Sequence, residues 1–268
     1  MRNKLAILGA SYLQIPLVNK AKKLGIETHV FAWEEGAVAS NLADHFYPVS
    51  ILGKEKILSL CKSIRPDGII SIGSDIAMPT VNYVAKELNL IGNSLSCSLV
   101  TTNKYEMRRQ LIKNKIPCPG YISFGADKIF QKDLVSELCY PLIVKPVDRS
   151  GSRGITLIES LAELETAVER AMAVSFSKQV IIEEFINGKE VSVEMISWKG
   201  THHFLAITEK VTTGPPYFVE VEQHEPAFVP DELHNKIISL TTASLSVLGV
   251  EYGASHSELI ITQNGELN

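Results

Sequence analysis

The sequence predicts an α/β protein. Two observations support this fold class: short apolar runs alternate with segments that carry one apolar face at helical spacing, and 45% of the 268 residues are hydrophobic. Alternating strands and helices are typical of a parallel sheet that is covered by helices. A chain of this length is expected to bury a sizeable core and to fold into two or more compact units.

The first 93 residues show the alternation most clearly. The expected elements are a strand at residues 4–9, a helix whose apolar positions Leu17, Val18, Ala21 and Leu24 share one face, a strand at 27–33, a helix at 54–63 and a strand at 68–72. This order predicts right-handed βαβ units and a small Rossmann-like domain over residues 1–93. Its first turn, GASYLQIP, lacks the G-x-G-x-x-G spacing of dinucleotide sites, so a dehydrogenase function rests on the βαβ pattern alone and a titration with NAD would test it.

The next segment, residues 94–182, begins with a helix expected over 101–114. Asn103 caps this helix and Glu106 follows at capping-box spacing, which places Lys104 in the first turn. A cation there opposes the helix dipole, so Lys104 either contacts a phosphate or points to solvent. Up to Ile182 the chain is then expected to run strand, helix, strand, loop, strand, helix, strand.

The last segment, residues 183–268, is expected to hold most of the remaining strands. The predicted elements are strands at 189–197 and 202–208, a helix at 230–248, a strand at 255–262 and a hairpin turn at Asn264-Gly265. Residues 209–226 are too rich in Gly, Pro and Thr for a helix. We interpret them as a loop over a site, although a plain surface connection has the same composition.

Two stretches carry residues that suit a nucleotide. Val180–Glu194, VIIEEFINGKEVSVE, offers an apolar run, backbone groups and the carboxylate of Glu190, which are what a purine ring and a ribose need. Pro141–Ile155, PLIVKPVDRSGSRGI, ends a strand in Lys145 and continues as a loop whose Gly and Ser residues expose N–H groups to phosphates. Each stretch alone also fits an ordinary sheet edge, and no Walker motif occurs.

Together the two stretches resemble the ATP-grasp superfamily, in its carbamoyl-phosphate-synthase-like and amino-acid-ligase branches. The resemblance implies a Rossmann-like domain at 1–93, then an ATP-grasp fold of α+β type, in which two antiparallel sheets clamp ATP. Residues 94–182 would form its N-terminal and lid subdomain, and residues 183–268 its C-terminal subdomain.

The resemblance also implies roles for individual residues. The expected phosphate contacts are Lys104, Lys145, Ser150 and Gly151. The expected adenine hinge is Glu183, Glu184, Phe185 and Ile186, and Glu190 is the expected ribose acceptor. Lys210 and Arg153 are expected to act on the transferred phosphate, and Glu258 to bind Mg²⁺ or Mn²⁺.

In the family, a second metal ligand lies on the strand that returns after Glu258. Glu266 does not fit this role: at about 3.3 Å per residue it would lie roughly 17 Å from Glu258 with a two-residue turn, and roughly 13 Å with a three-residue loop. Two carboxylates so far apart cannot share an ion that each binds at about 2.1 Å. The C-terminal subdomain is therefore expected to be incomplete, and the chain to be a fragment of a longer ligase that binds nucleotide weakly and turns over little or no substrate.

Two functional hypotheses follow from the resemblance. The first is an ATP-dependent ligase that joins a carboxylate, or bicarbonate, to an amine or ammonia through an acyl phosphate. The alternative is a non-catalytic ATP-binding or regulatory protein that keeps the clamp without its chemistry. The expected partners are small-molecule carboxylates and amines, and a homodimer is a candidate assembly.

Composition excludes several other classes. The net charge of −4 and the lack of a basic run argue against nucleic acid and anionic membranes as partners. No apolar stretch approaches the roughly twenty residues of a membrane span. The four cysteines lie far apart and no histidine stands at metal-ligand spacing, so free, buried thiols in the cytoplasm are expected.

Overall fold

The computed structural model describes residues 2–125, 135–215 and 218–268. The chain forms two compact units, Met1–Thr102 and Asn103–Asn268. The boundary between them falls after the helix α4 (Leu95–Thr102), later than the boundary at residue 93 that the sequence predicts. Each unit is described separately.

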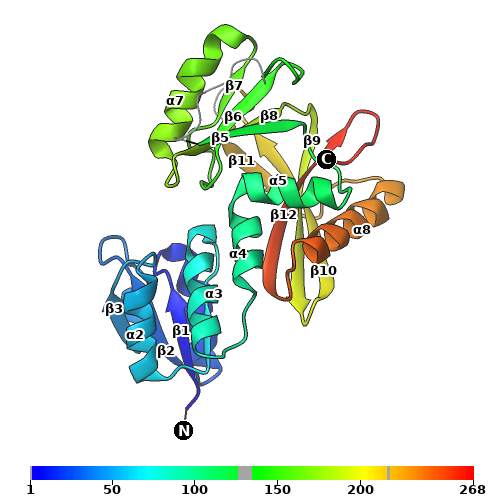
Figure 1. Ribbon diagram of the computed structural model, residues 1–268. Coiled ribbons are helices and arrows are strands. Elements are labelled where there is room, and N and C mark those ends of the chain that lie inside the picture. The colour runs from blue at the N-terminus through cyan, green and yellow to red at the C-terminus, as the bar shows by residue number, and fades with distance from the viewer. Residues whose placement is uncertain (1, 126–134, 216–217) are drawn as a thin grey trace. The chain divides into compact units, whose positions relative to one another are not determined.

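The N-terminal unit is a parallel sheet with helices on its faces (Figure 1). The strand order is β3-β2-β1-β4, and both neighbours of β1 run parallel to it, as predicted. The strands are β1 (Lys4–Leu8), β2 (Glu27–Ala32), β3 (His45–Pro48) and β4 (Gly68–Ile70). The helices are α1 (Ile15–Lys23), α2 (Lys54–Ile64), α3 (Met78–Glu87) and α4.

Alternation along the strands divides the core of this unit into two halves. Leu8 and Phe31 pack with Ile57 of α2 on one face, whereas Ile7 and Val30 pack on the other. Successive strand residues point to opposite faces, so a fully apolar run buries both sides of the sheet. Strand β3 was not predicted, because four residues at a sheet edge carry too short a pattern.

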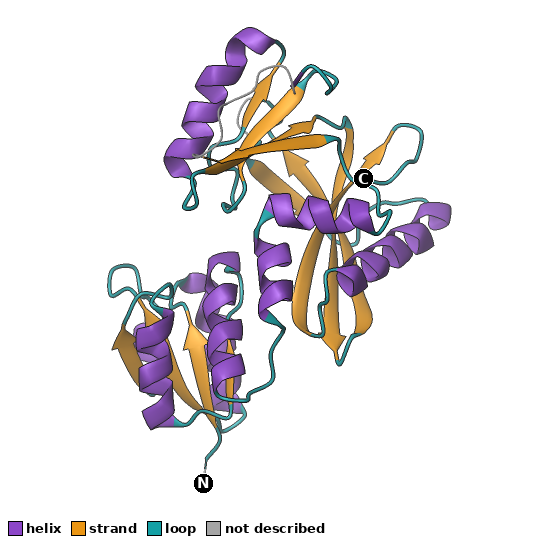
Figure 2. Ribbon diagram, viewed as in Figure 1, coloured by secondary structure: helices purple, strands orange, loops and turns teal. Residues whose placement is uncertain are grey.

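The C-terminal unit contains two antiparallel sheets (Figure 2). We call the first the lid sheet; its order is β5-β8-β6-β7, with β5 (Tyr121–Gly125), β6 (Leu142–Pro146), β7 (Thr156–Ile158) and β8 (Gln179–Glu184). We call the second the floor sheet; its order is β11-β10-β9-β12, with β9 (Gly188–Trp198), β10 (Thr201–Thr212), β11 (Glu220–His224) and β12 (Tyr252–Thr262).

In the described part of this unit, one helix packs on each of these sheets. Helix α7 (Leu164–Val174) buries Leu164, Val168 and Ala171 against the lid sheet. Ser160 and Glu163 stand three positions apart, a spacing that predicts a capping box, and this capping box is present just before the helix. Helix α8 (Asp231–Val247) contacts β9 and β10 of the floor sheet. The other helix predicted for the lid, between β5 and β6, lies outside the described residues.

The segment 209–226 differs from the prediction. Strand β10 continues to Thr212, and β11 pairs antiparallel with it, so that Lys210 lies opposite Gln223. Lys210 therefore sits on a strand in the interior of the sheet and not on a loop. Gly, Pro and Thr predicted a loop, but the run of β-branched Val and Thr residues supports a strand once a partner is present.

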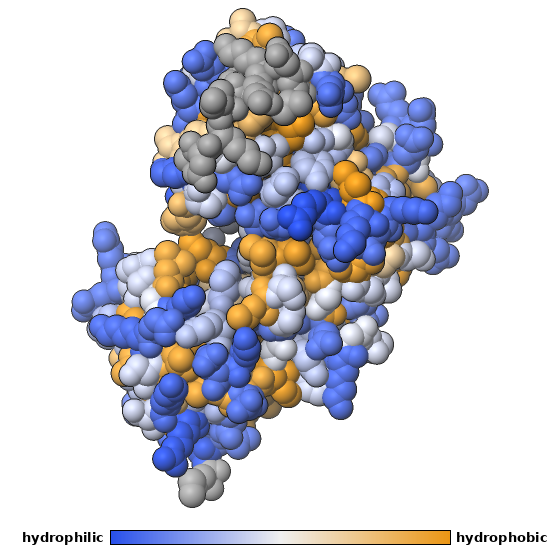
Figure 3. Space-filling view, in the orientation of Figure 1, coloured by the Kyte–Doolittle hydropathy of each residue, from blue (hydrophilic) through white to orange (hydrophobic). Residues whose placement is uncertain are grey.

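Helix α5 (Lys104–Lys113) follows α4 after a break at Asn103. The Asn103 side chain accepts a hydrogen bond from the Glu106 N–H at 3.1 Å, which confirms the predicted cap. Glu106 itself pairs with Arg109 at 3.1 Å. Hydrophilic side chains gather on the visible surface of α5 (Figure 3), in agreement with its low content of apolar residues.

A buried carboxylate joins α5 to the lid sheet. Glu183, on β8, is 3% exposed and accepts a hydrogen bond from Arg108 Nε at 2.7 Å. Its other oxygen lies 2.5 Å from Lys145 Nζ, on the neighbouring strand β6. Burial by itself raises the pKa of a carboxyl group, but Lys145 and Arg108 outweigh it and hold the pKa of Glu183 at about 2. We call Glu183, Lys145 and Arg108 the Glu183 cluster.

The four cysteines are free, as expected. Cys61 and Cys97 are buried, but Cys139 is exposed, which the sequence did not indicate. None of the helices in the described part of the chain combines the length and the apolar character needed to span a bilayer.

We expect Glu183→Gln to lower the free energy of unfolding by on the order of 3 kcal/mol at pH 7, because it leaves two partly buried cations without their counter-ion. Since the folded-state pKa lies below the ordinary value of 4.5, this contribution is complete above about pH 5 and is lost as the pH falls toward 2. Urea unfolding of both proteins between pH 2.5 and 7 measures it. Glu106→Gln, which breaks an exposed pair, is the control. If the difference in unfolding free energy between the wild type and Glu183→Gln does not depend on pH, Glu183 does not stabilise the fold through its charge.

The loop after β6 ends at a glycine that lies close to helix α7. Gly154 has φ +75°, and a Cβ there would lie 2.5 Å from Val174 Cγ2 of α7. We therefore expect Gly154→Ala to destabilise the unit by about 2–4 kcal/mol, from backbone strain and overpacking together. Gly200 has the same φ, and a Cβ there would meet no atom within 4 Å, so Gly200→Ala should show the strain alone, about 1–2 kcal/mol. Equal losses in urea unfolding would argue against the close contact.

Candidate functional site

The floor sheet presents a polar face opposite the one that packs on its core. Val191, Val193 and Met195 of β9 are buried, so the alternate residues Glu190, Ser192 and Glu194 share the other face. Antiparallel register extends this face across the sheet, because Glu194 lies opposite His256, and Ser192 opposite Glu258, both on β12. The strand pairing thus brings together charged residues that lie more than sixty positions apart in the sequence.

Lys210 is the centre of this face. Its side chain is only 8% exposed, and its ammonium group lies 3.1 Å from Glu190 Oε1 and 3.4 Å from Glu220 Oε2. It also donates a hydrogen bond to Glu258. We call these four residues the Lys210 cluster. Three of the residues predicted from the sequence, Lys210, Glu190 and Glu258, are therefore in direct contact.

A histidine extends the Lys210 cluster. His256 lies 2.7 Å from Glu194 and 3.6 Å from Glu258 through its two ring nitrogens. The neighbouring carboxylates of Glu258 and Glu194 raise the pKa of His256 to about 9, although burial opposes the shift. At neutral pH the imidazole is therefore protonated.

The carboxylates of this face remain in excess. The imidazole of His256 beside it and the attraction of Lys210 hold the pKa of Glu258 far below its usual range, against the effect of burial. Burial lowers the pKa of Lys210, but Glu258 and Glu190 outweigh it and raise that pKa above its ordinary value. Four carboxylates, Glu190, Glu194, Glu220 and Glu258, thus face two cations, which leaves about two negative charges. Hard oxygen donors with excess negative charge suit Mg²⁺ or Mn²⁺.

His256 and Glu194 were not selected from the sequence, although a signal was present. In SHSELIIT, His256 stands two residues before Glu258, and in KEVSVE, Glu194 stands four residues after Glu190. Even spacing on a strand places such residues on one face. Glu220 gave no signal, because its strand was interpreted as a loop.

The lid side of the unit is cationic. In the Glu183 cluster two cations share one carboxylate, and Arg108 was not selected from the sequence. Lys104 stands one helical turn before Arg108 on α5; its Nζ donates to the Arg149 carbonyl at 2.5 Å, and its N–H donates to the Val147 carbonyl at 2.8 Å. Lys104 lies on the same helix as Arg108, and Arg108 shares the Glu183 carboxylate with Lys145 of β6. Glu258 is among the charges that act on Arg108, which links the lid side to the Lys210 cluster.

The loop after β6 carries the other predicted phosphate contacts. Ser150, Gly151 and Arg153 are exposed on it. Gly151 and Ser152 have positive φ values of 66° and 55°. The Ser152 hydroxyl donates to the Phe218 carbonyl at 2.9 Å, so this loop contacts the segment that joins β10 to β11.

The predicted adenine hinge connects the two sheets. The N–H groups of Glu184 and Phe185 donate to the carbonyls of Gly120 and Pro141 at 2.9 and 3.0 Å. The Glu184 carboxylate accepts from the Cys139 N–H at 2.9 Å. The Phe185 ring lies 6.2 Å from that of Phe218, and Ile186 is half-buried beside it in the sequence. The Glu183 side chain, the first of the predicted hinge residues, forms ion pairs with Lys145 and Arg108.

The final hairpin has the longer of the two predicted turns. Ile260 and Asn268 exchange backbone hydrogen bonds at 2.9 and 3.1 Å, and the Thr262 N–H donates to the Glu266 carbonyl at 2.9 Å. Residues 263–265 therefore form a three-residue loop with Gly265 at φ 76°. Glu266 lies opposite Thr262, four positions and roughly 13 Å along the strand from Glu258.

Comparison with known proteins agrees with this architecture. Residues 138–268 match the model of the ATP-grasp domain. A formate-dependent phosphoribosylglycinamide formyltransferase of Prochlorococcus marinus is 26% identical over 286 residues, covering 98% of this chain and 69% of the relative. A D-alanine--D-alanine ligase of Flavobacterium johnsoniae is 35% identical over 177 residues, covering 62% of this chain and 53% of the relative.

A solved structure shows the same fold. The biotin carboxylase domain dimer of the Hydrogenobacter thermophilus 2-oxoglutarate carboxylase, in complex with MgADP, ADP and bicarbonate, superposes with a TM-score of 0.82 at 19% identity. The match covers all of this chain and 62% of that one. This chain thus spans roughly half to two thirds of the length of these proteins. The two antiparallel sheets, the order of the elements and the match over residues 138–268 lead to one conclusion: the chain carries an ATP-grasp domain.

Proposed function

We propose that the protein is an ATP-dependent ligase that activates a small-molecule carboxylate and joins it to an amine or ammonia. The observation that carries the proposal is the Lys210 cluster, an ammonium group held by three carboxylates in the same compact unit as the cations Lys104, Lys145 and Arg108. A triphosphate with its metal ion is complementary to this arrangement, because its oxygens pair with cations while its metal ion pairs with carboxylates.

Each group has a distinct part in this proposal. Lys104 and Lys145 bind nucleotide phosphate oxygens, aided by the N–H groups of Ser150 and Gly151. The main chain of Glu184 to Ile186 lies along the adenine edge, and Glu190 accepts the ribose hydroxyls. Glu258 supplies oxygen to Mg²⁺ or Mn²⁺, which when bound neutralises charge on the phosphates.

The chemistry requires no protein nucleophile. A carboxylate oxygen of the substrate attacks the terminal phosphorus of ATP and ADP leaves; the amine then attacks the acyl phosphate and inorganic phosphate leaves. Lys210 and Arg153 would stabilise negative charge on the phosphoryl group in transit, and such preorganised cations are a major source of rate enhancement. His256, which is protonated at neutral pH, keeps Glu258 ionised and oriented.

The names of the relatives support ligation in general. One is a formyltransferase that depends on formate, and the other joins two D-alanine molecules. Both names specify a carboxylate-containing substrate, but neither favours the carbamoyl-phosphate branch that the sequence suggests. The choice of carboxylate, and a homodimeric assembly, stay predictions.

Nucleotide binding is the direct test for the 268-residue chain. We expect a fluorescent ADP analogue to bind, and Lys104→Ala to weaken binding at least tenfold, about 1.4 kcal/mol. Lys113→Ala, in the last turn of the same helix, is the matched control and should leave the affinity unchanged. If both variants bind as the wild type does, Lys104 has no phosphate contact. Acceptor-dependent phosphate release would then separate a ligase from a binding protein.

Metal dependence tests the floor sheet. We expect Mg²⁺ to strengthen binding of the ADP analogue relative to EDTA in the wild type, and this gain to fall at least tenfold in Glu258→Gln, since an amide lacks the charge that a hard cation prefers. Glu266→Gln, on the returning strand of the same hairpin, should keep the full gain. A gain that survives in Glu258→Gln would exclude Glu258 as the metal ligand.

A further inference from the structure

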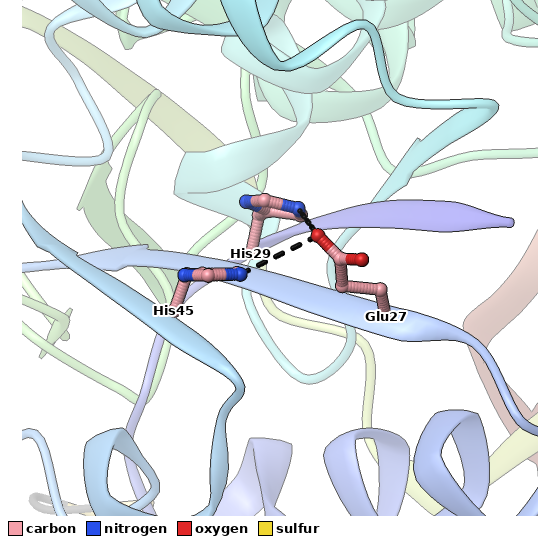
Figure 4. Close-up of side chains that lie close together, drawn as sticks. All are labelled: Glu27, His29 and His45. Carbon is pink, nitrogen blue, oxygen red and sulfur yellow. Dashed lines mark hydrogen bonds and ion pairs between the residues drawn. The ribbon is translucent and has the colours of Figure 1, made fainter. Parts of the chain in front are cut away.

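The N-terminal unit holds a separate group of metal-ligating side chains. Glu27 and His29 of β2 and His45 of β3 point toward one another (Figure 4). Glu27 Oε1 lies 2.9 Å from His29 Nε2 and 3.4 Å from His45 Nε2. Within the described ranges it is the one group of three or more His, Cys, Asp or Glu side chains whose ligand atoms all lie within 4.8 Å of one another.

The parallel register of the edge strand creates this group. His29 is paired with His45, and their rings stack with centroids 4.6 Å apart. Glu27 stands two positions before His29 and therefore shares its face of the sheet. The sequence gave no metal-ligand spacing for these histidines, because sixteen positions separate them and β3 was not predicted.

The two imidazoles are prepared for coordination in different ways. His29 is 4% exposed. Its other nitrogen, Nδ1, lies 3.0 Å from the Tyr47 hydroxyl. A hydrogen bond at the far nitrogen fixes the ring orientation and the tautomer of a ligating histidine. The side chain of His45, on the edge strand, is 51% exposed.

Two of the three ligand–ligand distances are close to those around a tetrahedral ion, and the third, between the two imidazoles, lies within 4.8 Å. Ligands at about 2.0–2.1 Å in tetrahedral geometry lie about 3.3–3.5 Å from one another. The Glu27–His45 separation of 3.4 Å already fits, and the Glu27–His29 contact of 2.9 Å has to open by about half an ångström. Two imidazoles and one carboxylate favour a transition-metal ion over Mg²⁺, and three protein ligands leave a position for water.

We propose that Glu27, His29 and His45 bind a divalent transition-metal ion, with Zn²⁺ as the reference ion, at the N-terminal edge of the parallel sheet. The site is distinct in chemistry from the carboxylate-rich face around Lys210. Its ligands come from two strands, so the bound ion would fasten the short edge strand β3 to β2 and stabilise the folded N-terminal unit by mass action.

The test is a titration of the tag-free, metal-depleted chain with Zn²⁺ against a chromophoric chelator. We expect one equivalent to bind, and His45→Ala and Glu27→Gln each to weaken binding at least tenfold. His224→Ala is the matched control, because His224 and Glu222 also lie 3.4 Å apart but belong to no group of three ligands among the described residues. The same titration in Glu258→Gln should still show the Zn²⁺ equivalent, which separates this site from the one proposed on the floor sheet.

Two further measurements test whether Zn²⁺ binds at these three residues. Zn²⁺ should raise the unfolding temperature of the wild type but not that of His45→Ala, and circular dichroism of the metal-free variant confirms that it folds. Co²⁺ bound at the site should show no thiolate charge-transfer band, which excludes the exposed Cys139 as a ligand. If His45→Ala and Glu27→Gln bind Zn²⁺ as tightly as the wild type, or if the wild type binds none at micromolar Zn²⁺, the proposal is wrong.

Discussion

A buried carboxylate sets the geometry of the C-terminal unit. Glu183 lies inside the lid sheet, where an unpaired charge is strongly unfavourable, so it requires cations that come to it. Lys145 reaches it from the neighbouring strand and Arg108 from helix α5. The helix is thereby held against the lid sheet, and Lys104, one turn earlier, is held at the loop that follows β6. The positions of both lysines thus depend on one ionised side chain.

The second consequence is a separation of charge within this unit. Two cations share Glu183 on the lid side, with Lys104 nearby, whereas four carboxylates face Lys210 and His256 on the floor sheet. Neither group is neutral by itself, so each can accept a ligand of opposite charge without first losing all of its own pairs. A nucleotide and its metal ion together carry both signs, which is the physical basis of the proposed function.

The same rule of strand faces produces the Lys210 cluster and the group of Glu27, His29 and His45. On the floor sheet, antiparallel register places Glu194 opposite His256; in the N-terminal unit, parallel register places His29 beside His45. The chemistry of the two groups differs because their composition differs. Carboxylates around an ammonium group favour hard cations, whereas imidazoles around one carboxylate favour transition metals.

The sequence by itself determined the order and type of most elements, the caps at Asn103 and Ser160, and the candidates Lys104, Lys145, Glu190, Lys210 and Glu258. These depend on local periodicity, on capping and on a resemblance carried by short motifs. Only the tertiary structure decided that residues 209–212 and 220–224 are paired strands, that Arg108 and Lys145 neutralise Glu183, and that His256 joins Glu194 and Glu258. The reason is physical: a strand, a buried ion pair and a cluster of ligands each need a partner distant in sequence, and the register that supplies this partner is fixed only when the sheets assemble.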